Sequence, residues 1–179
     1  MATYYSNNFT TTAGLSATTL EDGFIPYVGD INGRMRTKRM TFIPGAAMSA
    51  ADVVRMGQFR STDRLYALYY ESADMTGTST IDIGLYLSGA NHDGAVIDDD
   101  LFASAIDTSG QAVAYADILT SAALTPTDRG KSLWEQAAVG AASYTTNPNV
   151  MFDMTILVNA ATASTTAGFA LQAIYVAGD

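Results

Sequence analysis

An alternation of apolar and polar residues with a period of two limits this chain to β structure more than any other feature of its sequence. The segment 79–89, STIDIGLYLSG, places four aliphatic side chains on one face of an extended strand: Ile81, Ile83, Leu85 and Leu87. The segment 149–159, NVMFDMTILVN, repeats the pattern with Phe152, Met154, Ile156 and Val158. Each segment therefore predicts a strand with one face buried in a core.

Four further segments predict strands, at 38–44, 52–59, 64–72 and 168–178. The run 64–72, RLYALYYES, is apolar on both faces, which is typical of a central strand or of a strand that faces a neighbouring subunit. A loop of small polar residues joins 149–159 to 168–178, so we expect an antiparallel hairpin there. Short strands separated by turns favour a sandwich or jelly roll.

The predicted fold class is mainly β: an antiparallel β-sandwich, jelly-roll-like, with one or two short helices and an extended N-terminal arm. Residues 1–33 are polar and weakly periodic and form the arm, and residues 34–179 form the sandwich domain. We expect a short helix at 98–107, DDDLFASAID, with Asp98 as its N-cap. The segment 133–140 predicts a helical turn or an irregular strand, with Trp134 in the core or at an interface.

The formal net charge is −9, but residues 34–64 hold seven Arg or Lys residues against two Asp. An acidic chain is repelled by phosphate, so we expect no nucleic-acid partner. The basic segment either docks an acidic protein partner or forms a solvated strand face. The uncharged run 154–178 is interrupted by small polar residues, so it predicts no membrane span. The candidate partner-binding residues are the basic strand and the aromatics of the arm: Arg34, Arg36, Lys38, Arg39, Tyr4, Tyr5, Phe24 and Tyr27.

The stretch 91–102, NHDGAVIDDDLF, holds the single histidine, His92, and four carboxylates. The spacing does not match a calcium loop, and one histidine without cysteine cannot form a zinc site, which leaves a carboxylate-rich calcium site as the metal alternative. No nucleophile elbow or phosphate-binding loop occurs in the chain. We therefore expect a turn at 91–94 followed by the capped helix, and no catalytic residue, metal or cofactor.

The order of the segments resembles a known family. An Arg/Lys-rich strand ends in IPG (43–45) and is followed by DVVRMGQF (52–59), TIDIGLYLSG (80–89), DDDLFASAID (98–107), GKSLWEQAAVG (130–140) and GFALQAIYV (168–176). Over residues 34–176 this order resembles small virion structural proteins of tailed bacteriophages, of the capsid decoration or cement type. The resemblance lies in pattern and element order.

The resemblance implies a non-enzymatic sandwich subunit, a homotrimer, that binds the outside of a phage capsid. Its partner would be the major capsid protein, and it would stabilise contacts between capsomers. The alternative is a tail, neck or fibre module that binds a host glycan or another virion protein, for which Tyr144 and residues 147–149 are the candidate surface. A hydrolase on a sandwich scaffold is the third hypothesis, but nothing in the sequence selects a catalytic pair.

Overall fold

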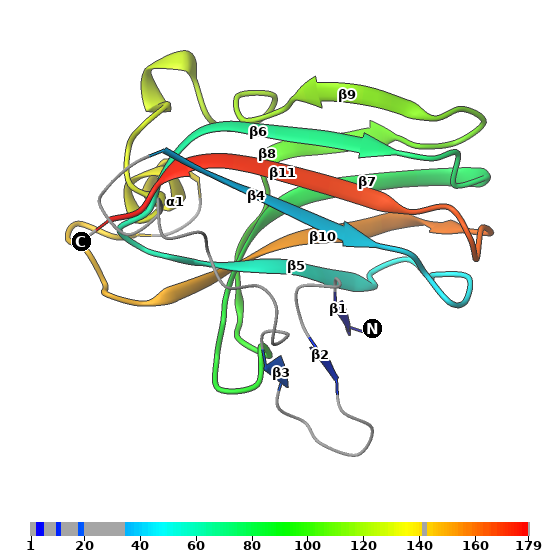
Figure 1. Cartoon of the computed structure of the whole chain (residues 1–179), viewed down its shortest axis with the longest axis horizontal. Helices are drawn as coiled ribbons and strands as arrows, with labels where there is room; N and C mark the ends of the chain where they lie inside the picture. Colours follow the sequence, from blue (N-terminus) through cyan, green and yellow to red (C-terminus); the bar gives the residue numbers. More distant parts are fainter. Residues whose placement is uncertain (1–2, 6–9, 12–17, 20–34, 141–142, 179) are drawn as a thin grey trace.

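The computed structural model of the chain describes residues 3–5, 10–11, 18–19, 35–140 and 143–178. Two sheets form the two layers of the molecule (Figure 1). The first sheet has the order β1 (Thr3–Tyr5), β5 (Val53–Arg60), β10 (Met151–Thr162), β7 (Gly77–Leu87) and β8 (Val96–Asp107). The second sheet has the order β4 (Met35–Phe42), β11 (Phe169–Val176), β6 (Arg64–Ser72) and β9 (Val113–Asp117). Four strands of each sheet are antiparallel, so the predicted mainly β fold class is confirmed.

The described chain also has smaller elements, among them the 3-10 turn η2 (Pro126–Asp128). A two-stranded ribbon pairs β2 (Thr10–Thr11) with β3 (Thr18–Thr19), and α1 (Leu133–Val139) confirms the helical reading of 133–140. Ser132 precedes α1, and its backbone N donates to Glu135 Oε2 at 2.9 Å. Trp134 packs against the core, as expected. No helix in the described residues is long and apolar enough to cross a membrane.

The core forms between the inner faces of the two sheets, because alternation sends the aliphatic side chains of each strand to one side. Of the predicted inward residues of β7 and β10, Leu87 is partly buried against the core and the others are fully buried: Ile81, Ile83, Leu85, Phe152, Met154, Ile156 and Val158. They share one hydrophobic cluster with Leu68, Tyr70 and Leu171 of the second sheet. Burial of this apolar surface is the main force that holds the two layers together.

The predicted hairpin between 149–159 and 168–178 is wrong. β10 lies between β5 and β7 in the first sheet, whereas β11 lies between β4 and β6 in the second. Both strands carry apolar inner faces, and the loop between them crosses from one sheet to the other. The polar loop correctly indicated two successive strands. Such strands can either pair in one sheet or lie in two facing sheets with their apolar faces packed across the core, and this chain has the second arrangement.

The predicted helix at 98–107 is also wrong, because this segment belongs to β8. The register places Asp98 opposite Leu85 and Ala103 opposite Ile83, so β8 advances by five residues while β7 advances by two. Such a bulge breaks the alternation and leaves consecutive residues, from Leu101 to Ala103, buried. Asp98 is therefore a strand residue and not a helix cap.

Candidate functional site

A buried polar cluster lies on the first sheet, beneath the connection 88–95 between β7 and β8. Asp153 of β10 falls on the face opposite Phe152 and Met154, and it is fully buried. Its Oδ2 lies 3.1 Å from Nη1 of Arg55, and its Oδ1 accepts a hydrogen bond of 2.8 Å from Ser88 Oγ. The fixed charge of the carboxylate is thus matched by a buried guanidinium from the neighbouring strand β5.

The same guanidinium holds the connection 88–95 in place. Arg55 Nη1 donates to the carbonyl oxygen of Leu87 at 3.0 Å, and Nη2 donates to that of Gly94 at 2.9 Å. The guanidinium also lies 4.8 Å from the ring centroid of Tyr86. Arg55 therefore contacts both ends of the connection 88–95. Its turn spans residues 89–92, two residues earlier than the predicted 91–94, and includes His92 at a φ of +53°.

The cluster contains serine, histidine and aspartate, so its geometry has to be compared with that of a hydrolase. His92 Nδ1 lies 3.1 Å from both carboxylate oxygens of Asp153 and 3.0 Å from Ser88 Oγ. In a catalytic triad the carboxylate and the serine contact different ring nitrogens. Here both contact the same nitrogen, and Ser88 also accepts a hydrogen bond from Gln58 Nε2 at 2.6 Å. The arrangement is that of a structural network and not of an activated nucleophile.

The acidic stretch of β8 is the candidate cation site. One carboxylate oxygen from each of Asp98, Asp99 and Asp100 lies within 4.8 Å of the others. Burial, followed by the contact with Asp100, raises the pKa of the Asp98 carboxyl. The side chain of Asp98 also lies against Gly140, where an added Cβ would overlap it. Acidic groups of this kind are common on acidic proteins, so the expectation of no metal stays a prediction.

The basic strand β4 divides its charges between two faces. Arg39 points outward, has a 52% exposed side chain and forms an ion pair with Glu71. Lys38 turns inward, where its Nζ donates to the carbonyl oxygen of Gln58 at 2.8 Å and lies 4.7 Å from the ring centroid of Phe59. Burial lowers the pKa of Lys38 to about 8. Arg36 is half-buried. Arg34 lies outside the described residues.

The arm contributes one strand at the same edge of the sandwich. β1 pairs in parallel with β5, with Tyr4 opposite Val54 and Tyr5 opposite Arg55. The inward contact of Lys38 with Gln58 joins β5 to β4, so β5 contacts both β1 and the basic strand. We call this side, formed by β1, β5 and β4, the arm edge. Phe24 and Tyr27 lie outside the described residues.

The outer face of the second sheet carries an aromatic surface that the sequence analysis predicted only in part. The rings of Tyr69 on β6 and Tyr115 on β9 stack with centroids 4.5 Å apart and planes 6° apart. The strand 64–72 does expose aromatic side chains, since Tyr66 is exposed while Leu65 and Leu68 are buried. A bulge in the pairing with β11 lets residues three positions apart share the inner face. β9 itself was not predicted, because five residues rich in alanine give a weak strand signal.

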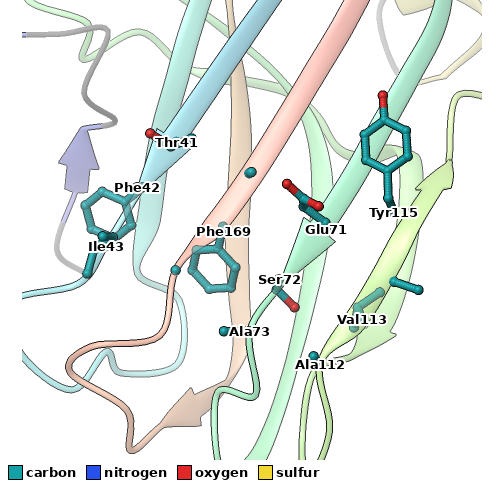
Figure 2. Close-up of a pocket in the computed structure, with 13 residues that line it drawn as sticks. Thr41, Phe42, Ile43, Glu71, Ser72, Ala73, Ala112, Val113, Tyr115 and Phe169 are labelled. Carbon is teal, nitrogen blue, oxygen red and sulfur yellow. The ribbon is translucent and has the colours of Figure 1, made fainter.

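A groove of about 530 Å³ lies beside the tyrosine pair, across the ends of the four strands of the second sheet (Figure 2). One wall holds the end of β4 and the other wall holds β9, with β11 and β6 between them. The labelled side chains that matter here are Phe42, Ile43, Glu71, Val113, Tyr115 and Phe169. The groove is mostly apolar, and its acidic group, Glu71, is the partner of Arg39.

The residues considered for glycan binding contribute to packing. The ring of Tyr144 lies 6.2 Å from that of Phe152 and packs against the core. Asn147 Oδ1 accepts hydrogen bonds from Ser61 Oγ at 2.7 Å and from the backbone N of Asn149 at 2.9 Å. These contacts hold the loop that leads into β10, and they do not present a flat aromatic ring to a sugar.

Comparison with known proteins gives similarity of structure without similarity of sequence. No known family matches the chain, and no curated protein matches it. A chain of the capsid of Ralstonia phage GP4 aligns over 82% of this chain and 86% of its own length, with a TM-score of 0.56 and 14% identity. A chain of the cyanophage Pam1 capsid asymmetric unit aligns over 94% and 97%, with a TM-score of 0.50 and 14% identity. The sandwich described here is therefore similar in fold to chains found in two phage capsids.

Proposed function

We propose that this protein is a non-enzymatic structural component of a phage virion. The observation that carries the proposal is the similarity of fold, over 82% and 94% of the chain, to chains of two phage capsids. The geometry of Ser88, His92 and Asp153 supports it, because the one cluster that resembles a hydrolase triad in composition lacks the geometry of one.

Within this role, we propose the decoration or cement type. The protein binds the outside of the capsid as a homotrimer, contacts the major capsid protein and stabilises contacts between capsomers. The element order of residues 34–176 supports this assignment, since it resembles that of such proteins. The −9 net charge of the chain argues against a role in contact with the packaged genome.

The arm edge is the proposed docking surface. Tyr4 and Tyr5 lie in β1, which adds to β5 through backbone pairing, and the basic strand β4 also contacts β5. Among the basic residues of the described part of β4, Arg39 presents the most exposed charge. Docking on an acidic capsid surface therefore depends on Arg39 first and on Arg36 second, and Lys38 contributes mainly by holding β4 against β5.

Co-sedimentation with capsids that lack this protein tests the proposal. We expect the purified chain to bind such capsids and to show extra density on their outer surface by electron microscopy. Binding should weaken as salt rises, because exposed charges are screened beyond about 8–10 Å at physiological ionic strength. Failure to bind capsids at low salt would contradict the decoration role.

A matched pair of variants tests the docking surface. Arg39→Glu should reduce capsid binding, whereas Lys131→Glu should not. Lys131 is also an exposed cation in an ion pair, with a side chain 44% exposed and bonded to Asp128 at 2.8 Å. Both variants change the net charge by the same amount, so a difference between them reports position alone. Because Arg39 pairs with Glu71 of β6, both variants are also compared by sedimentation velocity, and a loss of capsid binding supports the docking surface only where self-association is unchanged. Equal binding by both would place the docking surface elsewhere.

A further inference from the structure

We propose that the free edge of β9, together with the tyrosine pair Tyr69 and Tyr115, contacts a second copy of this chain. β9 is the last strand of the second sheet, and β6 is its single hydrogen-bonded neighbour among the described strands. The other side of β9 presents backbone N–H and C=O groups that can pair with a further strand. The inference rests on the proposed self-association and assigns it a surface.

Apart from Asp117 at its end, which pairs with Arg129, β9 lacks the charges that the edge strands β4 and β8 carry. Folded proteins normally prevent unwanted pairing with charged side chains or proline at sheet edges. β4 carries three cations in its described residues, and β8 carries the carboxylates at 98–100. By contrast, the segment 109–116, SGQAVAYA, has no charged residue and no proline, and residues 114–116 are exposed. An uncovered edge of this kind is typical of a strand that is covered in the assembled state.

The side chains around β9 add an apolar surface to the open edge. Tyr115 is 47% exposed, Tyr66 is 40% exposed and Ile43, on the far wall of the groove, is 66% exposed. Aromatic side chains of this kind are enriched at the centres of protein interfaces. The groove between Ile43 and Tyr115 offers a concave apolar surface for side chains of the neighbour (Figure 2).

The charges beside this surface favour a second copy as the occupant. Two copies of a chain with a net charge of −9 repel each other over most of their surfaces. Here the charged groups occur as pairs of opposite sign: Arg39 with Glu71, and Arg129 with Asp117, whose Nη1 and Oδ2 are 2.7 Å apart. A contact between copies through this face therefore adds no excess of negative charge, whereas a strongly charged partner would find no complementary net charge here.

Sedimentation velocity on the full chain, over a range of concentrations, tests the proposal. Wild type should form an oligomer, and Tyr115→Arg should weaken self-association at least ~10-fold, because an unpaired charge at a buried contact is strongly unfavourable. Val96→Arg is the control. Val96 is 52% exposed on β8 of the other sheet, and the variant adds the same charge, so it should associate as wild type does.

A second variant keeps the test valid if Tyr115→Arg does not fold. Ala114→Lys adds a protecting charge at an exposed position of the edge, so it should be folded and monomeric. Hydrogen exchange provides a second measurement. The amides of residues 113–117 should be protected at high concentration in wild type and in Val96→Arg, and should lose that protection in Ala114→Lys.

A wild-type chain that stays monomeric at every concentration would overturn the proposal, and so would an oligomer that persists equally in Tyr115→Arg and Ala114→Lys. Capsid co-sedimentation separates this result from the proposed function. A monomer that still binds capsids contradicts the β9 contact alone. An oligomer that dissociates in Ala114→Lys but never binds capsids contradicts the decoration role alone.

Discussion

The burial of Lys38 predicts how the free energy of unfolding changes with pH. β4 turns this lysine into the space between the two sheets, where its Nζ donates to the carbonyl oxygen of Gln58 and lies over the ring of Phe59. Burial lowers its pKa from 10.5 to about 8, and the negative charges of Asp63 and Asp153 oppose part of that shift. Folding of wild type at neutral pH therefore includes the cost of enclosing a charged ammonium group.

The sign and size of the effect follow from the difference in pKa between the folded and unfolded chains. Between about pH 8 and pH 10.5 the unfolded chain binds the proton of Lys38 more tightly, so the free energy of unfolding rises with pH. One pKa unit corresponds to about 1.4 kcal/mol, which gives at most about 3 kcal/mol over the whole window. Because the side chain is only half-buried, solvent screening makes the measured value smaller.

Chemical denaturation of wild type and Lys38→Met at several pH values provides the assay. At pH 7 we expect the variant to be more stable than wild type, because it buries no charge at this position. The loss of the hydrogen bond to Gln58 reduces this gain by about 1 kcal/mol. That advantage should shrink as the pH rises from 8 to 10. The tyrosines titrate in both proteins, so their effect cancels in the difference.

The only other lysine, Lys131, is the control. Its hydrogen bond with Asp128 raises its pKa, so Lys131→Met should show no such change between pH 8 and pH 10. With two lysines in the chain, an NMR titration of the side-chain resonances can assign the lowered pKa directly. A stability difference between wild type and Lys38→Met that is independent of pH would refute the reasoning.

Three further outcomes are expected. Asp153→Ala should lower the free energy of unfolding by roughly 3–5 kcal/mol, because it leaves Arg55 buried without its counter-charge, and a second change, Arg55→Met, should restore part of the loss in a double-mutant cycle. Gly84→Ala should lower the melting temperature, since its Cβ would overlap the backbone of β8, whereas Gly45→Ala, which meets open space, should not. Excess EDTA should leave the melting temperature unchanged, and a drop of several degrees would show that residues 98–100 hold a cation.

Strand positions could be predicted wherever one face of a strand enters the core. β7 and β10 alternate without interruption, and the inward residues of both were identified correctly. β8 was misread as a helix because its bulge buries the consecutive residues 101–103, which removes the alternation that marks a strand. The pairing of β10 with β11 in a hairpin was predicted wrongly, because the sequence of the loop between two strands does not show whether they belong to the same sheet.

The candidate partner-binding residues were also predicted only in part from the sequence. Lys38 and Arg39 were predicted together as partner-binding residues, but as neighbours in a strand they lie on opposite faces, and Lys38 faces inward. A signal was present, since Met40, fully buried, lies two residues from Lys38 on the same face of β4. The cluster around Asp153 was not predicted, because Arg55 and Ser88 lie far from it in sequence and only the sheet pairing joins them.

The positions of β10 and β11 have a consequence for how the chain folds. Each is a central strand of its sheet, and both come after every other described strand in the sequence. β5 and β7 cannot be joined until β10 has left the ribosome, and β4 and β6 cannot be joined until β11 has done so. Contacts between segments so far apart also close slowly, so a β protein of this kind folds in milliseconds to seconds. The core thus cannot close until β11 has been synthesised, and the nascent chain exposes unpaired strands until then.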